Sequence, residues 1–151
     1  MARHKFKIVE CTLADAVSNG CSELTSLAEE IREVVDNAEG GLAQTQRIQT
    51  LGETADTLEQ ISEPTIEGEV AKEMVKYAES IPSGRKGLSR RIRCDNAINA
   101  LDAAIEVLQE KSDNFTEGEG GSEEDPYKNL LDELEDIKGN AEACEFPGMF
   151  G

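Results

Sequence analysis

The chain has 151 residues, of which 38% are hydrophobic and none is Trp. This length is typical of one domain with a mostly aliphatic core. There are 32 acidic residues against 15 basic ones, and the net charge is −17. Such a charge argues against phosphate binding by the whole surface and against an anionic membrane. It suits solubility, a basic protein partner or imitation of nucleic acid.

Residues 1–11 predict a short extended arm, because Phe6 and Ile8 alternate with polar side chains. The segment lacks the apolar core of a signal peptide, and no window of the chain approaches membrane-spanning length. We therefore expect a cytoplasmic protein.

Residues 12–111 predict the core of a helical bundle. Apolar residues at intervals of three and four predict a first helix, which Thr12 caps and Gly40 ends. A short connection then predicts an antiparallel second helix over residues 42–61. A third helix is expected where five apolar residues again follow a helical spacing: Ile66, Val70, Met74, Tyr77 and Ile81.

The clearest helix is expected over residues 89–111, with Ser89 as its cap. We expect it to be the central helix of the bundle, because small residues flank its apolar seam and let other helices approach. Cys21 and Cys94 occupy seam positions and are expected to be small buried hydrophobes. The seam repeats at intervals of four and three: Cys94, Ile98, Leu101, Ile105 and Leu108.

Residues 112–126 are rich in glycine and glutamate and predict a flexible acidic loop. A C-terminal helix is expected over residues 127–143, followed by a tail over residues 144–151. The sequence thus predicts an all-α fold, a four-to-five-helix bundle with a short N-terminal arm and a C-terminal tail.

Positive charge is concentrated in two windows that contain no acidic residue. We expect these bases either to neutralise acidic helices of the same fold or of a neighbouring copy, or to bind an anion or an acidic partner. The first window holds Arg3, Lys5 and Lys7, and the second holds Arg85, Lys86, Arg90, Arg91 and Arg93.

Catalytic motifs are few. The only histidine is His4, in the predicted arm, and no known nucleophile or phosphate-loop pattern occurs. The stretch 113–124 has the length of an EF-hand loop, but Phe115 and Gly120 stand where a ligand and an apolar anchor are needed. We expect no catalytic residue and no cofactor from these features.

Carboxylates on the first two helices follow an EExxE pattern and then an ExxD pattern, at Glu29, Glu30, Glu33, Glu53 and Asp56. Carboxylates three and four apart share a helix face, and their oxygens suit Mg²⁺. The pattern resembles that of MazG-like all-α nucleotide pyrophosphatases. The resemblance implies Mg²⁺ at Glu30, Glu33, Glu53 and Asp56, and hydrolysis of a nucleoside triphosphate. Solvated helix faces explain the same residues.

Three segments, LAEEIREVVDN, LGETADTLEQI and RRIRCDNAINALDAAIEVL, carry a second resemblance. Together they span roughly residues 24–108 and are similar to small acidic helical proteins encoded in bacteriophage genomes. These proteins have no assigned chemistry, so the resemblance implies a viral setting, in the host cytoplasm or the virion, and no site.

The tail combines acidic residues with large apolar side chains at Phe146, Met149 and Phe150. No regular helix continues past Pro147, and exposed apolar groups of this density need a cover. One interpretation is a docking peptide, Phe146, Pro147, Met149 and Phe150, for a partner groove with a basic rim. The alternative is that the tail folds back onto its own bundle.

We therefore expect a non-enzymatic interaction protein, phage-encoded, with an accessory, assembly or host-protein-binding role. A protein partner is expected, a homo-oligomer is open, and nucleic acid would bind directly only through the basic windows. The alternatives are the Mg²⁺-dependent pyrophosphatase and a DNA mimic that inhibits a nucleic-acid-binding host protein.

Overall fold

The computed structural model describes residues 5–38, 45–82, 87–117 and 126–147. Within these ranges the chain is mostly helical and adds one small antiparallel sheet. The elements in chain order are β1 (Lys5–Thr12), α1 (Leu13–Asn37), α2 (Gln46–Glu59), the 3₁₀ helix η2 (Glu69–Lys72), β2 (Met74–Ile81), α3 (Arg90–Glu117) and α4 (Lys128–Ala143).

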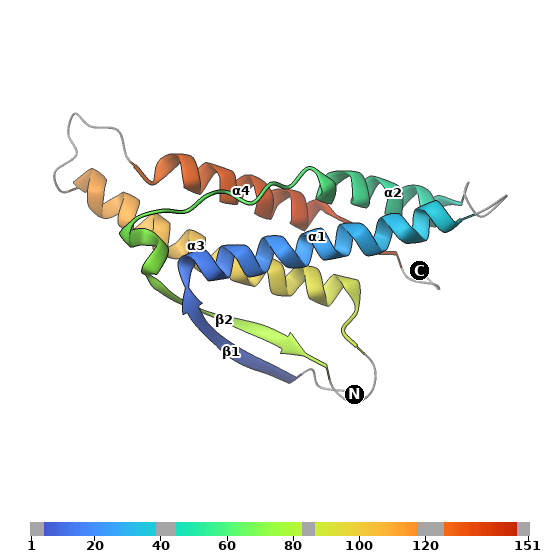
Figure 1. The fold of residues 1–151 in the computed structure, drawn as a ribbon, viewed down its shortest axis with the longest axis horizontal. Helices are drawn as coiled ribbons and strands as arrows, with labels where there is room; N and C mark the ends of the chain where they lie inside the picture. Colours follow the sequence, from blue (N-terminus) through green and yellow to red (C-terminus); the bar gives the residue numbers. More distant parts are fainter. Residues whose placement is uncertain (1–4, 39–44, 83–86, 118–125, 148–151) are drawn as a thin grey trace.

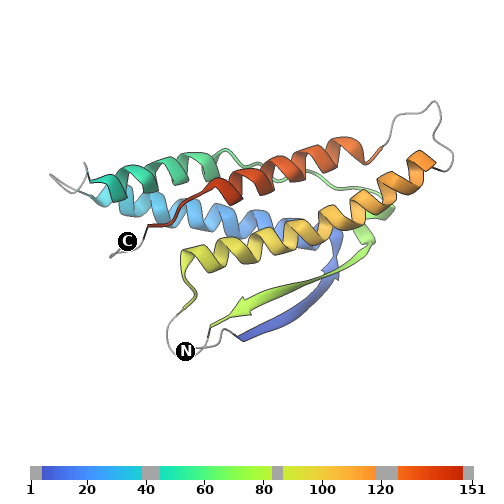
Figure 2. The same ribbon diagram turned by 180° about the vertical axis from the view of Figure 1, so that it is seen from behind.

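Three layers make up the molecule (Figure 1). The long helices α1 and α3 form the middle layer and pack against each other. The shorter helices α2 and α4 lie on one side of them, and the two strands lie on the other (Figure 2). The order of a strand, a long helix and a shorter helix thus occurs twice along the chain.

Helix α1 begins directly at the end of β1, and Thr12 belongs to both. Its hydroxyl accepts a hydrogen bond from the Asp15 N–H at 3.2 Å, as the predicted cap requires. Ser89 likewise accepts from the Ile92 N–H at 3.2 Å at the start of α3. Both predicted caps are therefore confirmed, whereas Gly40 lies outside the described residues.

The predicted seams of α1 and α3 form the core. Of the α3 seam, Cys94, Leu101 and Leu108 are fully buried, and Ile98 and Ile105 pack partly buried against them. The two helices approach closely at Gly20, where an added Cβ would lie 3.0 Å from the Leu101 Cγ and 3.1 Å from the Ala97 carbonyl oxygen. The absence of a side chain at Gly20 is therefore what lets α3 pack on α1.

The predicted third helix is wrong, and with it the purely all-α fold class. Residues 69–72 form η2 instead, and residues 74–81 form β2. Along β2, Val75 and Tyr77 are buried while Met74 and Lys76 are exposed, which is the alternation of a strand with one covered face. Gly68 has a φ of 83° at the entry to η2, a conformation that favours glycine.

The predicted N-terminal arm is extended, as expected, but it is one strand of a sheet. Lys5 pairs with Ile81 and Thr12 pairs with Met74, so β1 and β2 are antiparallel along their whole length. Helix α3 also continues beyond the predicted end at Lys111 to Glu117, into the segment expected to be an acidic loop. The rest of that segment, residues 118–125, lies outside the described residues.

Candidate interaction surface

The two edges of the sheet have opposite surroundings. The outer edge of β2 is covered by side chains of α3. Asn96 accepts from the Ser80 N–H at 2.8 Å and donates to the Ser80 carbonyl at 3.0 Å. Asn99 donates to the Ala78 carbonyl at 3.1 Å. Asn96 is buried, so the fold itself protects this edge of β2 at Ser80 and Ala78.

These contacts fix the direction of the backbone groups in β1. In an antiparallel pair, both polar groups of a residue point either toward the partner strand or away from it, and opposite residues share that direction. Ser80 and Ala78 point away from β1, and they are opposite Phe6 and Ile8. Phe6 and Ile8 therefore direct their N–H and C=O groups away from β2, to the free edge of β1.

Within the described part of the chain, no backbone or side-chain group hydrogen-bonds to that free edge. The same two residues also carry exposed apolar side chains. Phe6 is 67% exposed and Ile8 66%, and Met74 at the far end of this face is 55% exposed. An open strand edge beside large exposed apolar side chains is able to accept a further strand.

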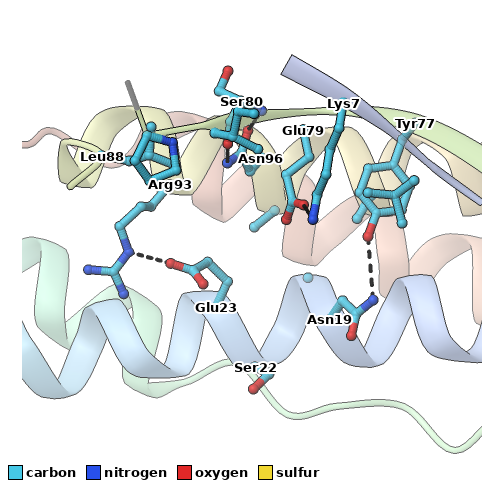
Figure 3. Close-up of a pocket in the computed structure, with 16 residues that line it drawn as sticks. Lys7, Asn19, Ser22, Glu23, Tyr77, Glu79, Ser80, Leu88, Arg93 and Asn96 are labelled. Atoms are coloured by element: carbon cyan, nitrogen blue, oxygen red, sulfur yellow. Dashed lines mark hydrogen bonds and ion pairs between the residues drawn. The ribbon is translucent and has the colours of Figure 1, made fainter. Parts of the chain in front are cut away.

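The opposite face of the sheet covers a cleft of about 630 Å³ against α1 and α3 (Figure 3). Its polar side chains are bonded to one another. Lys7 pairs with Glu79 at 3.3 Å, and Asn19 donates to the Tyr77 hydroxyl at 3.4 Å. Burial raises the pKa of Tyr77, and the hydrogen bond from Asn19 offsets only part of this increase. The phenol therefore remains neutral near pH 7.

Arg93 projects from α3 into the same region and makes an ion pair with Glu23 of α1 (Figure 3). It makes a second ion pair with Glu30 of the same helix. Partial burial lowers the pKa of Arg93, but hydrogen bonds to the two carboxylates outweigh it and raise the pKa overall. For Arg93, the structure therefore agrees with the interpretation in which the basic window neutralises acidic helices of the same fold.

The two other described bases of that window, Arg90 and Arg91, make no ion pair with a described residue. Arg91 is exposed, and Arg90 is half-buried. Arg91 lines a pocket of about 340 Å³ together with Arg47 and Phe146. Arg85 and Lys86 lie outside the described residues. Anion or acidic-partner binding by these four residues stays a prediction.

Two of the four predicted magnesium ligands, Asp56 and Glu30, form ion pairs with arginines. Arg32 of α1 binds Glu59 of α2 through two hydrogen bonds, at 2.7 and 3.2 Å, and also pairs with Asp56. These hydrogen bonds hold the pKa of Glu59 below its usual range and raise that of Arg32.

Glu30, the other predicted ligand with an ion-pair partner, is bound by Arg93. Glu33 and Glu53 are exposed on α1 and α2. Across the described residues, no three His, Cys, Asp or Glu side chains form a group that could hold a metal ion. The four predicted ligands all belong to the described residues, and the fold does not gather them.

The described part of the tail packs on the bundle. Cys144 is buried, Phe146 is half-buried against the core, and the buried Thr54 hydroxyl donates to the Glu145 carbonyl at 2.7 Å. Phe146 and Pro147 thus take the position expected if the tail folds back. Met149 and Phe150 lie outside the described residues, so docking through them stays a prediction.

The cysteines behave as hydrophobic core residues. Cys21, Cys94 and Cys144 are buried and free, as predicted for the first two. Burial raises the pKa of Cys94 to about 12 and that of Cys21 to about 11. These thiols therefore remain protonated at neutral pH and are poor nucleophiles.

Of the helices in the described residues, none is both long and apolar enough to cross a membrane. Comparison of the chain with protein-family models, with curated proteins and with solved structures found no match. The interaction surface is therefore argued from the geometry of the chain itself. The alternation of Phe6 and Ile8 predicted an extended segment, but sequence reasoning missed its free edge as a binding surface.

Proposed function

We propose that the chain is a non-enzymatic interaction protein that binds a protein partner by accepting a strand at the free edge of β1. The observation that carries this proposal is the combination of unpaired backbone groups and exposed apolar side chains at Phe6 and Ile8. Strand addition uses both features, since the backbone groups give affinity and alternate side chains give specificity.

The surroundings of the edge support the same role. Isolated two-stranded sheets are only marginally stable, but here α3 covers β2 and the helices hold the inner face. The free edge is therefore presented on a rigid support, which lowers the entropy lost on binding. The bacteriophage setting rests on the sequence resemblance alone.

A proline at Ile8 tests the proposal, because proline has no N–H to donate to an added strand. The N–H of Ile8 points away from β2, so Ile8→Pro removes no hydrogen bond of the β1–β2 ladder. The measurement is a pull-down from a lysate of the cells that naturally express the chain, with the purified chain as bait. We expect the Ile8→Pro variant to lose the proteins that the wild-type chain retains. Circular dichroism should show unchanged helix content.

Met74→Lys is the matched control, since it removes another exposed apolar side chain from the same face but away from the free edge. We expect this variant to retain the same proteins as wild type. If Ile8→Pro bait retains every partner at the wild-type level, strand addition at β1 is not the function.

A further inference from the structure

We infer that the strand added to β1 is β1 of a second copy of the chain, related by a twofold axis at Ile8; this inference rests on the proposed function. The even-numbered residues of β1 share the outer face of the sheet and point their backbone groups to the free edge. A continuous antiparallel sheet must therefore pair even positions with even positions.

Two registers satisfy this rule over seven of the eight residues of β1, one with the axis at Ile8 and one with the axis at Val9. With the axis at Ile8, residues 5–11 of one copy pair with residues 11–5 of the other. Ile8 then faces Ile8, and Phe6 faces Glu10, with Phe6 and the Ile8 side chains as diagonal neighbours on the outer face. Each of these pairs exchanges two N–H···O bonds, so the free backbone groups of Phe6, Ile8 and Glu10 are all satisfied.

This register also avoids opposing like charges. On the inner face Lys7 is opposite Val9, and Lys5 is opposite Cys11, while Lys7 keeps its ion pair with Glu79 in its own copy. An axis at Lys7 would instead place two lysines opposite each other and shorten the pairing to residues 5–9. An axis at Val9 would extend the pairing to Thr12, but Thr12 is the N-cap of α1, and its carbonyl already accepts the first hydrogen bond of that helix. The axis at Ile8 is therefore the favoured one.

The charge of the strand differs from that of the chain. Two lysines and one glutamate give β1 a net charge of +1, whereas the whole chain carries −17. Two copies that meet through β1 bring together the part of the surface that is not acidic, while their acidic helices repel at longer range. We expect added salt to strengthen the dimer between about 0.02 and 0.3 M, because it screens this repulsion.

The position of β1 leaves room for a second copy. In both ribbon views β1 is the outermost element, and β2 lies between it and the helices (Figures 1 and 2). Pairing would give a four-stranded sheet in the order β2, β1, β1, β2, with no helix displaced. Such an interface is small, so we expect association that depends on protein concentration.

Sedimentation equilibrium of the purified chain over a wide concentration range tests the inference. We expect a reversible monomer–dimer equilibrium that Ile8→Lys weakens about tenfold or more, because it places two ammonium groups at the axis. Met74→Lys should leave the dissociation constant unchanged. Both side chains are exposed, so both variants should fold, which circular dichroism would verify.

Cysteine cross-linking reads the register directly, in a Cys11→Ser background that removes the native thiol of β1. A hydrogen-bonded antiparallel pair has Cα atoms about 5.5 Å apart, within the range of a disulfide. Ile8→Cys should therefore form a covalent dimer on mild oxidation. Phe6→Cys should not, since its two copies would be offset by about 13 Å.

A monomer at every concentration, or a dimer that Ile8→Lys leaves intact and Ile8→Cys does not cross-link, overturns self-pairing. Neither result removes the proposed function, because another protein strand could still occupy the edge. That proposal fails separately, if Ile8→Pro bait retains all partners.

Discussion

The two strands of the sheet are equal in length and paired throughout, but their outer edges differ in what covers them. Asparagines of α3 bind backbone groups of Ser80 and Ala78 on the outer edge of β2, whereas the edge of β1 presents unpaired backbone groups beside Phe6 and Ile8. The comparison shows that side chains protect the strand edge that lies against the helices. The edge left without that protection is the one that we assign to binding.

The largest expected effect is the loss of stability when the core is truncated on α3, the helix that covers β2, compared with a truncation at the open edge of β1. Leu101 is fully buried on α3, the helix that also covers β2. We expect Leu101→Ala to lower the free energy of unfolding by about 2–5 kcal/mol, because it leaves a cavity opposite Gly20. Ile8→Ala, a side-chain truncation at the open edge, should cost less than about 0.5 kcal/mol. Denaturant unfolding measures both, and equal losses would contradict the comparison.

A smaller effect is expected from uncovering the edge of β2. Asn96→Ala leaves the N–H and the carbonyl of Ser80 without their partners, which should cost about 1–3 kcal/mol. Asn99→Ala is the control, since the Asn99 side chain is exposed and water replaces its single bond to Ala78. Amide exchange at Ser80 should accelerate only in Asn96→Ala. Equal behaviour of the two variants would mean that α3 does not protect this edge.

The smallest effect concerns a contact far from both edges, the ion pair of Arg32 with Glu59. The pKa of Glu59 is lower in the folded state, so its contribution to stability is present above the unfolded pKa of about 4.3 and is lost as the pH falls through the folded pKa. We expect the melting temperature of Glu59→Gln to lie slightly below that of wild type near neutral pH, and to converge with it in acid.

Glu53→Gln is the matched control for that pH series, because the Glu53 carboxylate makes no ion pair with any described residue. Its melting temperature should follow that of wild type at each pH. A gap between wild type and Glu59→Gln that stays constant down to about pH 2 would disprove the linkage to this carboxyl.

The helices could be predicted because each one has a pattern within its own segment of the sequence. The seam of α3 and the caps Thr12 and Ser89 are local patterns, and the structure confirms them. Strand β2 was missed because its apolar residues also fit a helical spacing when Ile66 and Val70 are counted with them. What decides its conformation is pairing with β1, which is distant in the sequence and leaves no local signal.

The candidate site shows a similar limit. The short connection correctly predicted that α1 and α2 pack together, but the carboxylate pattern left out Arg32, which lies between Glu30 and Glu33 in the sequence. In the fold that guanidinium takes the central position among acids of α2. The open edge of β1 could not be predicted either. The sequence does not indicate which edge of β1 pairs with β2, and this decides whether the backbone groups of Phe6 and Ile8 are paired or free.

The distance between the two strands along the chain has a consequence for the order of folding. Thr12 pairs with Met74, so even the closest pair is separated by 74 − 12 = 62 residues. During synthesis β1 leaves the ribosome before β2, with both of its edges unpaired, and its ladder cannot form until β2 follows. The helices between them form from local contacts in the meantime. The nascent chain therefore carries an unpaired strand with exposed apolar side chains until β2 is made, and this is the period in which it is most open to aggregation.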